Sequence, residues 1–214
     1  MARATRAVRT AGLGAVLLLA GGCGLKGGGD PIAASAGPSA RPVSAPPSGT
    51  GAATHGPTAP VIALPASCPD ILSLDDLDHA VGRFLPGRTV YIKGQGEPKI
   101  GRIGRVTCRY GVHSSGTATA VPVEVGLSSY ADAAAAAHLI QRTVDQQRDA
   151  GASQSDVTVG DTPATVLLAA DSSSLVLARG ALTVAVTITK EVAPADGAAA
   201  VLTALATAAM ARLS

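Results

Sequence analysis

Side chains able to carry out acid–base or metal chemistry are scattered along this chain. The four histidines are His55, His79, His113 and His138. They show none of the spacings typical of a metal-binding helix. Three aspartates crowd residues 75–78, where carboxylates near the start of a helix are already favoured by the backbone dipole. We therefore expect no metal site and no acid–base pair.

Two further motifs fall short of a catalytic or phosphate-binding pattern. The sequence GLSSY at 126–130 lacks the final glycine of a nucleophile elbow, so we interpret Ser128 and Ser129 as a turn and a helix cap. The glycines of GQGEPKIGRIG at 94–104 are not followed by the Lys-Ser/Thr of a phosphate-binding loop, which favours a hairpin. We predict no catalytic residue and no cofactor, and hence that the protein is not an enzyme.

Basic side chains are concentrated between Val81 and Val112, a segment with seven Lys and Arg residues and a single acidic residue, Glu97. Six form a candidate anion-binding face: Arg88, Lys93, Lys99, Arg102, Arg105 and Arg109. Such a face would attract anionic envelope material, for example phospholipid head groups or wall phosphates. The alternative is a solvated face whose charges pair with the acids of the first helix.

The N-terminus has the three parts of an export signal. Residues 1–9 carry three arginines, residues 10–20 are uncharged and mostly apolar, and Gly21, Gly22 and Cys23 follow. This apolar run is shorter than the roughly 20 residues that a helix needs to cross a bilayer. The stretch from Ala20 to Cys23 resembles the lipobox of bacterial lipoproteins. An ordinary secretory signal is the alternative.

The lipobox resemblance implies a signal peptide at 1–22 and a diacylglycerol-bearing cysteine at Cys23. With two acyl chains, such as palmitate, the protein would be held stably on the extracytoplasmic face of the cell membrane. Of the 17 Lys and Arg residues, Arg3, Arg6 and Arg9 would be removed, leaving 14 against 15 Asp and Glu. Because the mature chain would be near neutral, we expect no nucleic-acid partner.

Two thiols, Cys68 and Cys108, remain once Cys23 is lipidated. The export signal places them where oxidation persists, so we predict a disulfide between them. Their α-carbons should then lie within about 4.4–6.8 Å of each other. The alternative is two independently buried thiols, since cysteine often packs as a small apolar residue.

The segment between Cys23 and residue 66 is rich in Gly, Ala, Ser, Thr and Pro. It offers too little bulky apolar surface to offset the entropy of ordering, which predicts a disordered tether. Its Ser, Thr and Pro content would permit O-glycosylation.

Hydrophobic periodicity predicts one folded domain over residues 67–214. Helices are expected near 73–84, 132–149 and 194–213, and strands near 88–93, 105–112, 121–127, 163–170, 175–179 and 181–189. The order is helix, three strands, helix, three strands, helix. Since the strands are joined by short turns, we predict an α+β fold: an antiparallel sheet of about 5–6 strands covered by about three helices.

Several finer expectations follow from the same patterns. Alternation in 105–112 points Cys108 inward, and Pro122 suggests an edge strand or a bulge. Ser129 and Asp132 are expected to cap the second helix. The buried faces of the two long helices are predicted as Ala133, Ala137, Ile140 and Val144 in the second, and Leu202, Leu205, Ala209 and Met210 in the third.

A second resemblance spans about residues 66–214. The pattern of SCPDILSLDDL, the cysteine of VTCRYGV, the strand pair beginning VGDTPA and the Ala-rich last helix is similar to secreted lipoproteins of actinobacteria. The resemblance implies a small α+β domain, in some families related in shape to periplasmic sensor domains. It carries over no catalytic residue.

These observations predict a membrane-anchored, non-catalytic binding or interaction module of the cell envelope. Expected partners are the membrane, through the lipid on Cys23, and anionic envelope polymers or another envelope protein. One alternative is a carrier that encloses a lipid or small hydrophobic ligand between the sheet and the second helix. A second alternative is a hydrolase without a recognisable motif. An organised cavity would favour the carrier, and a filled core the interaction module.

Overall fold

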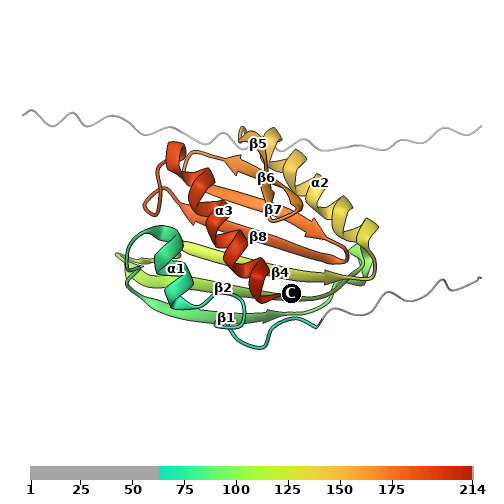
Figure 1. The fold of residues 1–214 in the computed structure, drawn as a ribbon, viewed down its shortest axis with the longest axis horizontal. Helices are drawn as coiled ribbons and strands as arrows, with labels where there is room; N and C mark the ends of the chain where they lie inside the picture. The colour runs from blue at the N-terminus through green and yellow to red at the C-terminus, as the bar shows by residue number, and fades with distance from the viewer. Residues whose placement is uncertain (1–62, 214) are drawn as a thin grey trace, which may run out of the picture. The chain divides into compact units, whose positions relative to one another are not determined.

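Three α-helices and an antiparallel sheet make up residues 63–213, the part of the chain that the computed structural model describes (Figure 1). The helices are α1 (Leu74–Val81), α2 (Ala133–Asp149) and α3 (Ala195–Arg212), with a 3-10 helix η1 (Pro98–Ile100). The strands are β1 (Arg88–Gly94), β2 (Arg102–Ser115), β3 (Ala118–Ala120), β4 (Val123–Tyr130), β5 (Ser153–Val159), β6 (Thr162–Leu168), β7 (Ser172–Arg179) and β8 (Leu182–Thr189). The predicted lipidation site Cys23 and the tether up to residue 62 lie outside this part.

Strand order in the sheet is β1-β2-β4-β8-β7-β6-β5, with the short β3 paired to β2. Neighbouring strands are antiparallel throughout. One meander runs from β1 to β4, a second from β5 to β8, and β4 joins β8 in the middle. The predicted α+β class with an antiparallel sheet and three helices is therefore confirmed.

The sheet has eight strands rather than the five to six predicted. The two strands that the sequence patterns did not predict are β3, which has only three residues, and β5. In β5 the sequence SQSDVTV places a single side chain, Val159, fully in the core. An edge strand that packs so little apolar surface lacks the alternation by which strands are recognised.

The main core lies between one face of the sheet and the helices α1 and α3, which cross in front of the strands in Figure 1. The predicted buried stripe of α3 is confirmed, and Cys108 points into this core as expected. Ser73 accepts a hydrogen bond from the backbone N–H of Asp76 and begins α1, and Gly82 ends the helix in a left-handed conformation. These local signals agree with the tertiary packing.

Helix α2 packs on the opposite face of the sheet, over β6, β7 and β8, with Val144 against Leu167 and Val176. Its buried face passes through Ala136 and Val144, whereas Ala133 and Ala137 are exposed, so the predicted face was wrong at those positions. Five successive alanines at 133–137 differ in no property that could reveal which of them faces the sheet.

Two predictions around β4 were also wrong. Ser128 and Ser129 form neither a turn nor a cap of α2: both lie buried in β4, and Asp132 alone accepts the capping hydrogen bond, from the N–H of Ala135 at 2.7 Å. Pro122 does not mark an edge strand, because β4 lies inside the sheet between β2 and β8. Pro122 immediately precedes β4, so its missing N–H removes no bond from the ladder, and its carbonyl accepts from the N–H of Thr189.

Candidate functional site

The candidate site lies on the sheet face opposite α1 and α3, over β1 and β2. Side chains of β2 alternate between the faces, so that Cys108 enters the core while Arg105, Thr107 and Arg109 take the opposite face. Helix α2 covers this opposite face over β6–β8. Over β1 and β2 the face stays open, as the exposed side chain of Ile92 shows.

Side chains of β1, β2 and β4 on this face line an open cleft of about 350 Å³, which we call the arginine cleft. It is lined by Ile92, Gly94, Gln95, Arg102, Arg105, Thr107, Arg109 and Glu124. Three of the six basic residues predicted to form an anion-binding face thus line one cleft.

Arg102 reaches the cleft because β2 is irregular at its start. Arg105 follows Arg102 by three positions, an odd number, so regular alternation would place the two on opposite faces. The register with β4 shifts between Arg102 and Gly104, leaving Ile103 unmatched. A bulge of this kind re-aims the neighbouring side chain, and here it turns Arg102 to the side of Arg105. No sequence signal predicted this change.

Two of the three arginines are paired with carboxylates. An oxygen of Glu97 lies 2.6 Å from Arg102, and an oxygen of Glu124 lies 2.8 Å from Nε of Arg109. Arg105 makes no ion pair with any residue in the described part of the chain. The cleft therefore carries one uncompensated positive charge on an exposed side chain.

Glycines on both neighbouring strands make room for Arg105. Gly94 of β1 stands directly opposite Arg105, and a Cβ built on Gly94 would lie 3.3 Å from the Cβ of Arg105. On β4, a Cβ built on Gly126 would lie 3.9 Å from both Nη2 of Arg105 and Oγ1 of Thr107. The guanidinium thus extends over Gly126, beside the hydroxyl of Thr107, and Arg105 stays exposed, so that a ligand could approach it.

This arrangement suits an anionic group. Guanidinium groups bind carboxylates and phosphates through two parallel hydrogen bonds, which are stronger than hydrogen bonds between neutral groups. In addition, Nε of Arg102 is buried and has no hydrogen-bond partner among the described residues. A buried donor without a partner is unfavourable, but this nitrogen is closed to solvent, so the exposed guanidinium of Arg105 is the group that an anion could reach.

The other predicted members of the basic face lie elsewhere. Lys93 pairs with Val106 and so belongs to the core side of the sheet, at its rim. Lys99 is in η1, and Arg88 begins β1 opposite Val112. The arginines of the cleft pair with Glu97 and Glu124, not with the acids of α1 that the alternative interpretation invoked.

A second open cleft, of about 400 Å³, lies near the same edge of the sheet but on its other face. We call it the apolar cleft. Its apolar lining includes Leu64, Tyr91, Ile103 and Val106, with Lys93 at its rim. Residues 63–66 form one wall of this cleft, where the hydroxyl of Tyr91 donates to the carbonyl of Pro65 at 2.9 Å.

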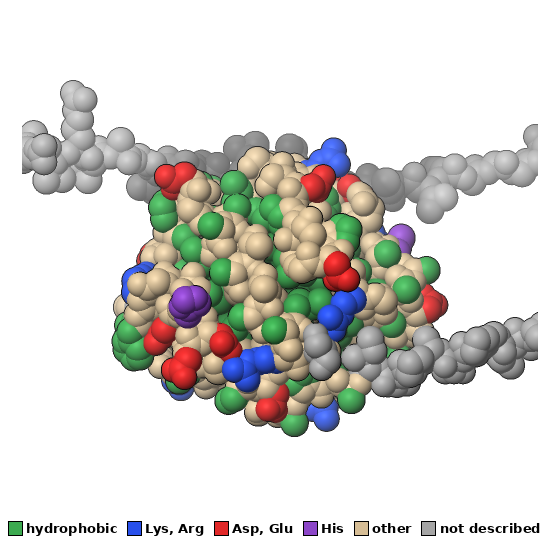
Figure 2. Space-filling view, in the orientation of Figure 1, with side chains coloured by type: hydrophobic (Ala, Val, Ile, Leu, Met, Phe, Trp, Pro, Cys, Tyr) green, Lys and Arg blue, Asp and Glu red, His purple; other side chains and the backbone are tan. Residues whose placement is uncertain are grey.

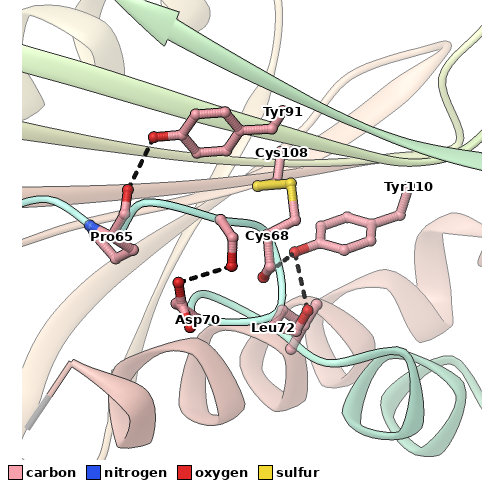
Figure 3. Close-up of a disulfide and its surroundings, with 8 residues drawn as sticks. Pro65, Cys68, Asp70, Leu72, Tyr91, Cys108 and Tyr110 are labelled. Carbon is pink, nitrogen blue, oxygen red and sulfur yellow. Dashed lines mark hydrogen bonds between the residues drawn. A yellow bond between two sulfur atoms is a disulfide. The ribbon is translucent and has the colours of Figure 1, made fainter.

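A disulfide between Cys68 and Cys108 holds the segment before α1 against the sheet (Figure 3). The α-carbons are 5.6 Å apart, within the predicted range, and both residues are buried. Close by, the buried hydroxyl of Tyr110 lies 3.2 Å from the carbonyl of Cys68 and 3.1 Å from that of Leu72. The predicted disulfide is confirmed.

Two pKa shifts occur around this segment, both outside the arginine cleft. Burial raises the pKa of the Tyr110 hydroxyl far above its ordinary value of 10.0, with Arg212 acting weakly in the opposite direction. A hydrogen bond from Ser73, followed by one from Arg212, lowers the pKa of Asp76. Both groups serve to hold the N-terminal part of the domain together.

Three other features of the described residues lie outside the two clefts. Within residues 63–213, no group of three or more His, Cys, Asp and Glu is placed to hold a metal ion. None of the helices there has the length and apolarity to cross a membrane. The exposed face of α3, seen in Figure 2, carries a shallow cleft lined mostly by alanine and threonine.

Comparison with known proteins found a likeness to a solved structure and no match in sequence. No protein-family model matches the sequence, and no curated protein matches it. Among solved structures, the extracellular domain of PknH from Mycobacterium tuberculosis is similar at 11% identity and a TM-score of 0.34. The likeness covers 64% of this chain and 93% of that domain.

Proposed function

We propose that this protein is a lipid-anchored, non-catalytic binding module on the extracytoplasmic face of the cell membrane, and that it binds an anionic partner in the arginine cleft. The observation that carries the binding site is Arg105, whose charge no carboxylate of the described residues balances, between Arg102 and Arg109. Support for export comes from the N-terminal signal pattern and from the disulfide, which persists in oxidising compartments.

The packing of the domain supports an interaction module over a carrier. Large side chains fill the core between the sheet and the helices α1 and α3. Both clefts at the β1–β2 edge are open to solvent, so neither has the closed shape of a ligand container. A binding module with an exposed site fits these features better than a container for a lipid.

Anchoring is tested by replacing Cys23. The Cys23→Ser chain should leave the membrane fraction, whereas the wild-type chain should remain there and show the mass of its acyl chains. If wild-type protein shows no acyl mass and the variant stays membrane-bound, the anchor proposal is wrong.

Anion binding is tested with the Cys23→Ser chain, so that the lipid does not contribute. Phosphatidylglycerol vesicles, inorganic polyphosphate and polyglutamate serve as separate probes, because phosphate and carboxylate share the relevant chemistry. Binding to at least one of them should weaken with rising salt and with Arg105→Glu. Arg142→Glu on α2 makes the same change in net charge away from the cleft and should leave binding unchanged. Equal binding by both variants would refute the arginine cleft as the site.

A further inference from the structure

Strand β1 forms one edge of the sheet, beside the arginine cleft. In the described part of the chain, β1 lies at the end of the strand order and pairs only with β2. Along its seven residues, the backbone groups on the outer side are therefore open to a further strand. The other end of the sheet, at β5, is also an edge, but it carries the acid Asp156 and adjoins neither of the two clefts at the β1–β2 edge.

The arginine cleft and the apolar cleft meet at this edge from opposite faces of the sheet. Gly94 and Arg105 line both of them, and the guanidinium of Arg105 lies on the side of the arginine cleft, near Gly126 and Thr107. On one face, Ile92 and Gly94 lie beside the arginines, whereas on the other face Tyr91 lies among apolar groups. An edge strand with two chemically different clefts is suited to an extended chain, whose side chains alternate between the faces.

We infer that β1 accepts an extended segment of another protein as an additional strand, in which carboxylate side chains enter the arginine cleft and alternate apolar side chains enter the apolar cleft. The inference rests on the proposed function, because it uses the same arginines, and it names the partner as an acidic peptide segment. Backbone hydrogen bonds to β1 would supply affinity, and the two clefts would supply specificity.

The geometry around Gly94 permits the key contact. Neighbouring strands lie about 4.8 Å apart, so an added strand would be about 10 Å from β2. A residue of the added strand opposite Gly94 projects on the same face as Arg105, and Gly94 places no side chain between them. A glutamate and an arginine extended toward each other can span that distance.

Charge selects the partner. Strand β1 carries Arg88 and Lys93 and no acidic residue, and Arg105 adds an unbalanced charge behind it. Pairing of two β1 edges from two copies of this chain would bring like charges together, which disfavours a second copy. An acidic segment meets positive charge near both ends of β1.

The test uses a fluorescent peptide in which glutamate and valine alternate, and the Cys23→Ser chain. A control peptide has the same composition arranged as one glutamate block and one valine block, and so the same charge. The alternating peptide should bind at least about tenfold more tightly than the block peptide. Arg105→Glu should weaken its binding by about tenfold or more, and Arg142→Glu should not.

Backbone pairing is tested on the peptide, so that the fold of the protein is not at risk. Methylating the amide nitrogens that face β1 should abolish binding, whereas methylating the alternate amides should not. Amides of β1 should also become protected from hydrogen exchange when the peptide binds.

Equal binding of the two peptides, or no effect of either methylation, would overturn the inference. If the phosphatidylglycerol vesicles, polyphosphate or polyglutamate still bound through Arg105 in that case, the proposed anion binding would be kept and only the strand addition would be wrong. If neither the peptides nor the polyanions bound, both would fall.

Discussion

The disulfide between Cys68 and Cys108 should contribute a large part of the stability of this domain. The two residues are separated by 40 positions, and both sulfur atoms lie in the core. In the chain-entropy model, closing a loop of this length in the unfolded state stabilises the fold by about 4 kcal/mol. Typical domains have a total stability of only about 5–15 kcal/mol, so reduction should have a visible effect.

The assay is urea unfolding followed by circular dichroism, with and without a thiol reductant. For a denaturant dependence of about 2 kcal/mol per molar urea, loss of 4 kcal/mol should lower the unfolding midpoint by about 2 M. The double variant Cys68→Ala and Cys108→Ala should unfold near the reduced wild type, and reductant should not change it.

A change in unfolding free energy below about 1 kcal/mol on reduction would refute this reasoning. It would mean that the segment before α1 is held by its packing and by hydrogen bonds such as those of Tyr110. The same result would show that the loop is already constrained in the unfolded chain.

Three further predictions concern single residues. Tyr110→Phe should lower the unfolding free energy by about 1–3 kcal/mol in urea unfolding. The buried carbonyl of Leu72 loses the hydroxyl donor that it shares with the carbonyl of Cys68, which keeps two backbone N–H donors; an unchanged value would argue against the bond to Leu72. Gly87→Ala should lower the unfolding free energy by more than about 3 kcal/mol, because its Cβ would overlap the backbone of Gly111. Gly160→Ala has nothing within 4 Å of its Cβ and should lower the unfolding free energy by only about 1 kcal/mol. Equal urea-unfolding midpoints of the two variants would contradict this prediction. Asp76 has a pKa below its ordinary value of 3.8, so the stability that its charge contributes is complete above that value and is lost as pH falls through the folded-state pKa. In thermal unfolding over a series of pH values, the difference in stability between wild type and Asp76→Asn should therefore disappear in acid. A difference that stays constant with pH would contradict this prediction.

Local patterns predicted most of the elements because each depends on neighbours in the chain. Ser73 and Asp132 are helix caps whose side chains reach backbone N–H groups three residues ahead. The buried stripe of α3 follows from large apolar residues at helical spacing. Where such contrast is missing, as in the alanines of α2 or the polar edge strand β5, the sequence offered no basis for a correct prediction.

The candidate site was predicted only in part. Arg105 and Arg109 share a face because both belong to one strand and are separated by an even number of positions, which alternation reveals. Lys93 faces the other way because of its register with Val106, and Arg102 joins the cleft only through the bulge before Gly104. Of the six basic residues predicted to form one face, three therefore line the arginine cleft.

The sequence by itself determined the α+β class, the positions of the helices and the identity of the disulfide partners, because these depend on periodicity, capping and a count of thiols. The tertiary structure alone decided which charges stay unbalanced and which cleft they line. Glu97 and Glu124 reach their arginines through strand pairing, and glycines of two other strands leave Arg105 exposed. Such neighbours are set by register across the sheet, and register depends on packing between segments that are distant in the chain.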